Sequence, residues 1–199
     1  MYYFKRTLIK ICAFFVITPI CAQQTDKIYF FKEIGWTITL PSDFKALDSI
    51  ENAKKNERGL KAIEESNEIK ADITELKTLI AASKDTYNYF NSTITPFDPK
   101  VDGPYDSTNK IVKDMVYKTF LDNMPNAKID SVTTEETIDG LFFDKFHVTI
   151  TIKENFILNM FLLSKYYKGY DFGISYLYLD VKTKEQIETM LKNSKFKKL

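Results

Sequence analysis

The feature that most restricts the fold is an apolar run, "FILNMFLL" at residues 156–163, in which only Asn159 is polar. A strand with one face in water alternates apolar and polar residues, because successive side chains point to opposite faces of the sheet. A run that is apolar in both phases is typical of a strand covered on both faces. The chain is therefore predicted to build a β-sheet that is buried on both sides.

The segments around this run indicate that the sheet is antiparallel. Residues 142–152 alternate apolar and polar after the turn pair Asp139-Gly140, and the strand "YDFGISYLYL" follows the apolar run after Lys168-Gly169. Such short turn signals between strands are typical of hairpins. Further strands are predicted in "IYFFKEIGWTITLP", and a further pair in "LKTLIAAS" and "TYNYFNSTIT".

Three helices complete the prediction. The first covers residues 48–66, and the second begins at an N-cap, Ser107 or Thr108, and ends before Pro125. One face of the second helix is expected to carry Ile111, Val112, Met115, Val116 and Phe120. One face of the last helix is expected to carry Ile187, Met190, Leu191 and Ser194. The predicted fold class is α+β, an antiparallel β-sheet covered by helices on both faces in an α/β/α sandwich.

Residues 1–22 have the three-part form of a secretory signal peptide. Lys5, Arg6 and Lys10 make the start positive, an apolar stretch follows, and Ala22 precedes polar Gln23 at a plausible cleavage point. The apolar stretch is shorter than the roughly 20 residues that a membrane-spanning helix needs. We therefore expect cleavage after Ala22, an extracytoplasmic location in the periplasm or outside the cell, and no transmembrane segment in the cleaved chain.

Cys21 leaves one alternative open, a lipoprotein anchored at this cysteine. The residue before a lipid-modified cysteine is normally small, whereas Ile20 is bulky, so ordinary cleavage is favoured. Cleavage removes both cysteines, Cys12 and Cys21, and leaves a chain without disulfides or thiol ligands. It also removes three positive charges, which changes the net charge from +1 to −2. This balance gives no electrostatic basis for binding nucleic acid.

Residues 27–199 contain no repeat or linker and are predicted to form a single domain, and their order of elements resembles the PsbP-like family. The resemblance is carried by "GWTITLPSDF" at residues 35–44, by the central helix before Pro125, by the long hairpins, and by "NSKF" at residues 193–196. The family includes the extrinsic subunit of photosystem II, a Ran-binding relative and bacterial lipoproteins and adaptors. The resemblance implies this α+β fold and non-catalytic binding, and it carries no site residue over.

The residues required by the common catalytic and cofactor sites are missing from the cleaved chain. It has no Gly-x-Ser-x-Gly elbow, no cysteine, no glycine-rich phosphate loop and one histidine, His147, which is expected on a sheet face. We therefore expect no catalytic residue and no cofactor. A loop with Asp98, Asp102 and Asp106 supplies oxygen atoms for calcium, but each aspartate also suits a turn or a helix start.

The most suggestive group of side chains is aromatic and lies in one predicted hairpin. Tyrosine has an apolar ring with a polar tip and is enriched at interfaces. The predicted partner-binding residues are Tyr166, Tyr167, Tyr170, Tyr176 and Tyr178. The alternative, which residue type alone favours, is that these tyrosines belong to the core, because aromatic residues suit strands.

Three hypotheses about function follow. The leading one is an exported, non-catalytic binding or adaptor module for a protein partner. The second is a carrier of a small apolar ligand housed between a helix and the aromatic sheet face. The third is a carboxylate-based hydrolase, which requires two acids that face one cleft.

Overall fold

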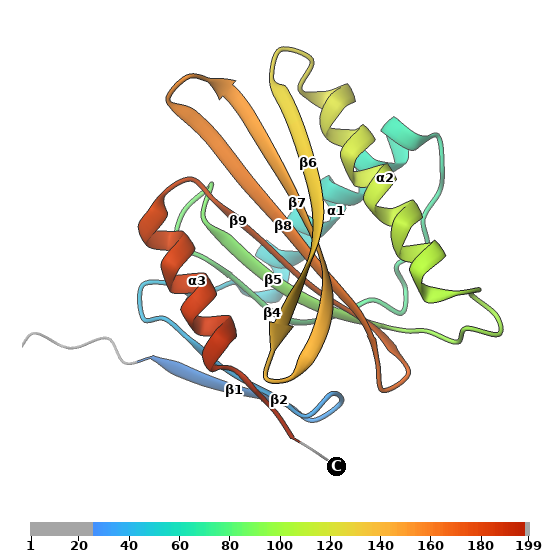
Figure 1. Ribbon diagram of the computed structural model, residues 1–199, viewed down its shortest axis with the longest axis vertical. Coiled ribbons are helices and arrows are strands. Elements are labelled where there is room, and N and C mark those ends of the chain that lie inside the picture. The colour runs from blue at the N-terminus through green and yellow to red at the C-terminus, as the bar shows by residue number, and fades with distance from the viewer. Residues whose placement is uncertain (1–25, 198–199) are drawn as a thin grey trace, which may run out of the picture.

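The computed structural model describes residues 26–197, in which a seven-stranded antiparallel sheet is the main element (Figure 1). The predicted signal peptide, with Cys12 and Cys21, lies outside the described residues. In spatial order the sheet contains β3 (Lys45–Ala46), β4 (Lys77–Ser83), β5 (Tyr89–Pro96), β9 (Tyr170–Tyr178), β8 (Phe156–Tyr167), β7 (Leu141–Lys153) and β6 (Lys128–Ile138). Strand β6 is therefore one edge of the sheet.

The long hairpins form where the sequence predicts turns. In the β6–β7 turn Asp139 and Gly140 have φ of 47° and 83°, and in the β8–β9 turn Lys168 and Gly169 have φ of 53° and 81°. Two-residue hairpin turns with positive φ at both positions match the right-handed twist of the strands they join. These turns set the register that pairs Ile138 with Leu141 and Tyr167 with Tyr170.

The apolar run in β8 is divided between two hydrophobic cores, as predicted. Phe161 and Leu163 belong to the larger core on one face, whereas Leu158 belongs to the smaller core on the other face. A strand that is apolar in both phases thus has both faces covered.

The larger core is covered by a helix and a second, three-stranded sheet. This small sheet contains β1 (Lys27–Phe31), β2 (Trp36–Leu40) and β10 (Lys195–Phe196), and the helix is α3 (Val181–Asn193). Helix α3 buries Ile187, Met190 and Leu191, as the spacing of these residues predicts.

The opposite face is covered by α1 (Ser49–Asn67) and α2 (Tyr105–Asn123), which pack along each other. Helix α2 places Val116, Tyr117 and Phe120 on the smaller core. Helix α1 reaches the sheet near β4, where the Asn52 amide donates to the Thr78 hydroxyl at 3.0 Å. The fold class is therefore the predicted one.

The start of α2 differs from the prediction. The helix begins at Tyr105 after Pro104, with no side-chain cap, so neither Ser107 nor Thr108 is the N-cap. The Thr108 hydroxyl instead donates to the carbonyl of Asp102 at 3.2 Å. The predicted apolar face is also wrong in part: Ile111 and Val112 are exposed, because α2 turns a more polar face with Asn109 and Lys113 toward the sheet. No helix within residues 26–197 is both long and apolar enough to cross a bilayer.

Candidate functional site

The five tyrosines of the β8–β9 hairpin do not form one surface. Tyr176 and Tyr178 are buried, so the prediction that they are available to a partner is wrong. The cause is the period-two alternation of β9, which places both in phase with Phe172 and Ile174 in the larger core. The Tyr176 ring also stacks on Phe161 with centroids 4.8 Å apart.

The other three tyrosines lie at the turn end of the hairpin. Tyr167 and Tyr170 are half-buried against the larger core. Tyr166 is 41% exposed, and its ring centroid lies 5.7 Å from that of Phe97 and 5.9 Å from that of Tyr105. Partner binding by Tyr166, Tyr167 and Tyr170 stays a prediction, and Tyr166 is the most accessible of them.

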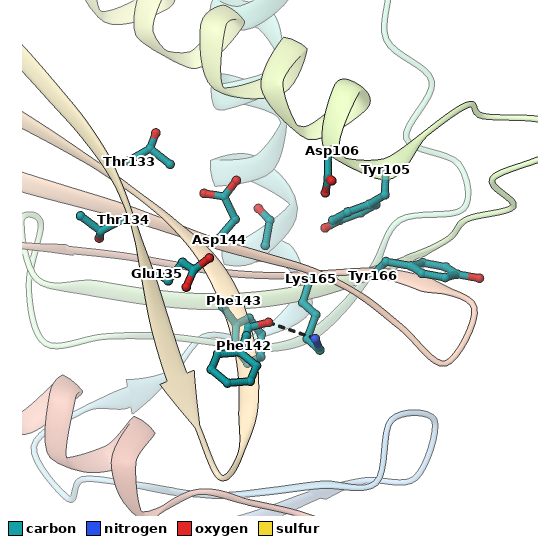
Figure 2. A pocket seen from close by; sticks show the side chains of 11 residues that line it. Tyr105, Asp106, Thr133, Thr134, Glu135, Phe142, Phe143, Asp144, Lys165 and Tyr166 are labelled. Carbon is teal, nitrogen blue, oxygen red and sulfur yellow. Dashed lines mark hydrogen bonds between the residues drawn. The ribbon is translucent and has the colours of Figure 1, made fainter.

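Tyr166 lines an open hollow between the first turn of α2 and strands β6, β7 and β8 (Figure 2). Its volume is about 670 Å³. We call this site the hollow, and it is lined by Tyr105, Asp106, Thr133, Thr134, Glu135, Phe142, Phe143, Asp144, Ser164, Lys165 and Tyr166. The register of the three strands places these residues side by side, because Asp144 of β7 lies opposite both Glu135 of β6 and Ser164 of β8.

One wall of the hollow is fixed by a hydrogen bond between Tyr105 and Asp171 of β9. The Tyr105 hydroxyl donates to the Asp171 carboxylate at 2.7 Å. Burial, together with the adjacent charge of Asp171, raises the pKa of Tyr105, so the phenol stays protonated as a donor. Burial also raises the pKa of Asp171, while the hydrogen bond from Tyr105 opposes that rise. This pair holds the start of α2 against the sheet.

Asp144 anchors α2 to β7 one turn further along the helix. One carboxylate oxygen, Oδ2, accepts from the Asn109 amide at 2.9 Å and from the Lys113 ammonium at 2.7 Å. The other oxygen, Oδ1, is buried and has no hydrogen-bond partner among the described residues. The hydrogen-bonding capacity of Asp144 is therefore only partly used within the chain.

The remaining charges of the hollow are at its open side. The Lys165 ammonium donates to the Phe142 carbonyl at 3.0 Å (Figure 2). Asp106 and Glu135 are exposed, and within residues 26–197 neither carboxylate has a hydrogen-bond or ion-pair partner. The Phe142 side chain is 65% exposed beside them. The hollow thus combines exposed aromatic surface with carboxylates that are free to accept hydrogen bonds.

The acids of the hollow bear on the hydrolase hypothesis. The hydrolase hypothesis requires two acids at one cleft, and Asp106, Glu135 and Asp144 do line the hollow. Burial raises the pKa of Asp171, but this acid is held by Tyr105 and is not among the residues that line the hollow. The hydrolase hypothesis therefore stays a prediction.

His147 is a sheet-face residue, as expected. Its ring stacks on Phe161 with centroids 4.0 Å apart, and its Nε2 lies 2.9 Å from Oδ1 of Asn159 and 3.2 Å from the Thr149 hydroxyl. Burial lowers the pKa of His147, while the contact with Asn159 acts in the opposite direction. The ring is the outer end of an aromatic ladder across β7, β8 and β9.

The aspartates of the 97–104 loop act on the local backbone. The Asp98 carboxylate accepts from the Lys100 amide at 2.9 Å, and the Asp102 carboxylate accepts from the Asp98 amide at 2.7 Å. Asp106 lies in the first turn of α2 instead. Within the described residues no group of three or more His, Cys, Asp or Glu side chains could hold a metal ion.

The second hypothesis places an apolar ligand between a helix and the sheet, where a pocket of about 420 Å³ beside α3 is lined in part by Ile138, Tyr176 and Leu191. The larger core between the small sheet and the main sheet is filled by the chain's own rings. Trp36 packs edge-on against Phe172 at 5.4 Å and stacks on Phe196 at 6.0 Å. Phe143 packs edge-on against Phe172 at 5.6 Å. These rings come from β2, β7, β9 and β10, so the two sheets share one aromatic core here.

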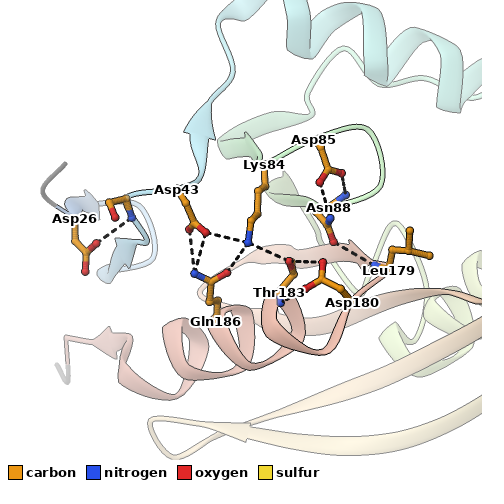
Figure 3. Close-up of polar contacts among 10 residues, drawn as sticks. Asp26, Asp43, Lys84, Asp85, Asn88, Leu179, Asp180, Thr183 and Gln186 are labelled. Carbon is orange, nitrogen blue, oxygen red and sulfur yellow. Dashed lines mark hydrogen bonds and ion pairs between the residues drawn. The ribbon is translucent and has the colours of Figure 1, made fainter. Parts of the chain in front are cut away.

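A polar network fastens α3 to the rest of the fold (Figure 3). The Lys84 ammonium pairs with Asp43 at 2.9 Å and donates to Oε1 of Gln186 at 3.0 Å. The Asp180 carboxylate caps α3 by accepting from the Thr183 amide at 2.8 Å. We call this cluster the α3 network, and it comprises Asp43, Lys84, Asp85, Asn88, Asp180, Thr183 and Gln186.

Comparison with known proteins identifies the fold. No family model and no curated protein matches the sequence. Among solved structures, the chain is similar to cyanobacterial PsbP (CyanoP) from Synechocystis sp. PCC 6803, with a TM-score of 0.51 and 8% identity over 90% of this chain and 97% of CyanoP. The chain has a PsbP-like fold. A match to LpqN of Mycobacterium tuberculosis, a protein involved in cell envelope biogenesis, has a TM-score of 0.45 and 8% identity over 85% and 89% of the two chains.

Sequence reasoning missed the hollow, although one signal was present. Alternate residues of β7, namely Phe146, Val148 and Ile150, face the smaller core, and Asp144 is two residues before Phe146 in this alternation. A carboxylate in the apolar phase of a strand marks a position where the sheet face meets polar groups or water. The residues that complete the hollow come from distant segments and have no shared local pattern.

Proposed function

We propose that this PsbP-like chain is an exported, non-catalytic adaptor that binds a protein partner at the hollow. In this proposal residues 1–22 are removed during export, residues 27–199 act as one domain, and the protein works outside the cytoplasm. The predicted signal peptide supports this location. The resemblance to the PsbP-like family adds an expectation of binding without catalysis.

The observation that carries the proposal is the pair of exposed aromatic side chains at the hollow. Phe142 is 65% exposed and Tyr166 is 41% exposed, on two adjacent strands of the same sheet. Exposed aromatic residues beside a concave, partly polar surface are typical of the residues that dominate protein–protein binding. The Tyr166 ring is also held by Phe97 and Tyr105, so little side-chain freedom is lost when a partner covers it.

Comparative capture from the organism's own cell envelope tests the proposal. We expect the protein to retain a specific polypeptide, and we expect Tyr166→Ala and Phe142→Ala each to reduce its recovery by about tenfold, the effect of losing roughly 1.4 kcal/mol of binding.

Tyr87→Ala is the matched control. Tyr87 is 42% exposed, lies in the β4–β5 turn, and packs edge-on against Phe156 as Tyr166 packs against its own neighbours. Recovery that is equal for the wild type and both hollow variants, with all four proteins folded, would contradict docking at the hollow.

A further inference from the structure

A second concave site, separate from the hollow, lies beside α3. Its volume is about 420 Å³, and pockets of about 300 to 1,000 Å³ are typical of sites for small molecules. The end of β6, one side chain of β9 and the last turns of α3 form its walls. We call this site the Tyr176 pocket, and it is lined by Glu136, Thr137, Ile138, Tyr176, Glu188, Leu191 and Lys192.

The inner wall of the Tyr176 pocket is part of the larger core. Ile138, Tyr176 and Leu191 are each less than one-tenth exposed, and all three belong to that core. The other lining residues are exposed or half-buried and form the rim. A molecule that enters the pocket therefore meets an apolar surface that the fold has already assembled.

The observation that points to a ligand is the hydroxyl group of Tyr176. Tyr176 is 2% exposed, yet within residues 26–197 its hydroxyl group has no hydrogen-bond partner. Most buried polar groups in proteins have such a partner, because a buried group without one is unfavourable. The hydroxyl oxygen is not one of the fully enclosed unpaired atoms, so it is open to the pocket that Tyr176 lines.

The Tyr176 hydroxyl group is held in place as a hydrogen-bond donor. The Tyr176 ring stacks on Phe161 with centroids 4.8 Å apart and on Tyr178 with centroids 6.5 Å apart. Burial, the largest cause, and the nearby charges of Glu188 and Glu136 raise the pKa of Tyr176, so the phenol stays protonated. A protonated phenol donates to an acceptor such as a carbonyl oxygen.

The charges at the rim favour an uncharged molecule. The Glu136 carboxylate pairs with the Lys145 ammonium at 2.7 Å, and the Glu188 carboxylate pairs with the Lys184 ammonium at 3.8 Å. A cation would compete with these two lysines, whereas an anion would meet two carboxylates and one ammonium group at the rim. A purely apolar molecule would remove water from the Tyr176 hydroxyl group without offering it an acceptor.

Contacts between distant segments fix the walls of the pocket. Ile138 precedes the β6–β7 turn, where the Asp139 carboxylate accepts from the Phe196 amide at 2.8 Å and from the Lys195 ammonium at 3.1 Å. These bonds tie the end of β6 to the segment that follows α3. The α3 network fastens the other end of the helix (Figure 3). The walls are therefore in place before a ligand binds, which limits the cost of ordering them.

We propose that the Tyr176 pocket binds one small uncharged molecule, with its apolar part against Ile138 and Leu191 and a carbonyl oxygen that accepts from the Tyr176 hydroxyl group. This activity goes beyond the docking of a protein at the hollow and does not depend on it. It gives a chemical class to the small ligand of the second hypothesis.

The test uses two fluorinated probes of the same shape, para-fluoroacetophenone and para-fluoro-α-methylstyrene. The first has a carbonyl oxygen where the second has a methylene group. The protein is titrated with each probe and followed by fluorine and amide NMR. We expect the ketone to bind with a Kd on the order of 1 mM and to shift the amides of Ile138, Tyr176 and Leu191 saturably.

Two matched substitutions assign the hydrogen bond. Tyr176→Phe removes only the hydroxyl group, and we expect it to weaken binding of the ketone about fivefold and to change binding of the alkene by less than about twofold. Tyr178 lies two residues further along β9 and is 7% exposed. Its hydroxyl group also has no hydrogen-bond partner in the part of the chain that the structure describes, but Tyr178 does not line the pocket. We expect Tyr178→Phe to change neither affinity.

Three results would overturn this inference. The first is the absence of saturable shifts at the pocket with the ketone, which would show that the pocket holds only water. The second is an unchanged affinity of Tyr176→Phe for the ketone, and the third is an equal loss of affinity for both probes. Capture of a partner at the hollow is measured separately, so a failure of one proposal leaves the other standing.

Discussion

The α3 network and the hollow are both polar clusters on the same fold, but they differ in how far their charges are paired. In the α3 network each charge meets a partner: Lys84 pairs with Asp43, and Asp180 accepts from Thr183 (Figure 3). In the hollow Asp106 and Glu135 have no partner among the described residues (Figure 2). Paired groups of this kind stabilise a fold, whereas unpaired acceptors beside exposed rings are available to another molecule.

The same contrast exists between two neighbouring residues of β7. Phe143 is 1% exposed and packs in the larger core, whereas Phe142 is 65% exposed at the hollow. One position in the strand therefore decides whether a phenylalanine stabilises the fold or faces solvent.

The largest expected effect is on stability. Phe143→Ala should reduce the free energy of unfolding by about 3 to 5 kcal/mol, because it leaves a cavity among Phe172, Phe196 and their neighbours. Phe142→Ala should change it by about 0.5 kcal/mol or less. Urea unfolding of the two variants measures both values, and similar losses would show that the hollow is as tightly packed as the core.

A smaller effect is expected at the cap of α3. The amide hydrogen bond from Thr183, the largest cause, lowers the pKa of Asp180 below its ordinary value of 3.8. Asp180→Ala should therefore reduce stability by about 1 kcal/mol near neutral pH. A carboxylate whose pKa is lower in the folded state than in the unfolded state stabilises the fold at pH values above its unfolded-state pKa. This stabilisation is lost as the pH falls through the folded-state pKa. The difference between wild type and variant should narrow below about pH 4, and a difference that is constant with pH would contradict the assignment.

The smallest effect on the free energy of unfolding is expected at Asp171 beside the hollow. Its dependence on pH is opposite to that expected at Asp180. Burial raises its pKa, so the folded state loses stability relative to the unfolded state as pH rises from the ordinary value of 3.8 through the raised one. In Asp171→Asn the amide oxygen can still accept from the Tyr105 hydroxyl. Because asparagine does not ionise, the variant does not lose stability in this way as pH rises. The variant should gain stability relative to wild type as pH rises above 3.8. A loss of stability relative to wild type as pH rises would show that the ionised Asp171–Tyr105 contact stabilises the fold.

Much of the fold could be predicted because its signals are local. Alternation in β7, the apolar run in β8 and the turns at Asp139-Gly140 and Lys168-Gly169 each depend on a few consecutive residues. The start of α2 could not be predicted in the same way. Ser107 and Thr108 suit an N-cap by residue type, yet α2 begins at Tyr105, where the hydroxyl is tied to Asp171 on another strand.

The site was less predictable because it depends on register and on distant segments. The cluster of tyrosines in the β8–β9 hairpin is real, but the phase of β9 buries Tyr176 and Tyr178 and leaves Tyr166 accessible. The partners of Tyr166 at the hollow come from α2, β6 and β7, which no spacing within the hairpin indicates.

Site-specific photo-crosslinking in living cells tests the central claim most directly. A photoreactive phenylalanine analogue is introduced in place of Tyr166, or in place of Tyr87 as the control of matched exposure. We expect one discrete protein adduct from position 166 and none from position 87. Adducts of the same mass and yield from both positions, or from position 87 alone, would contradict the claim that the hollow is the docking surface.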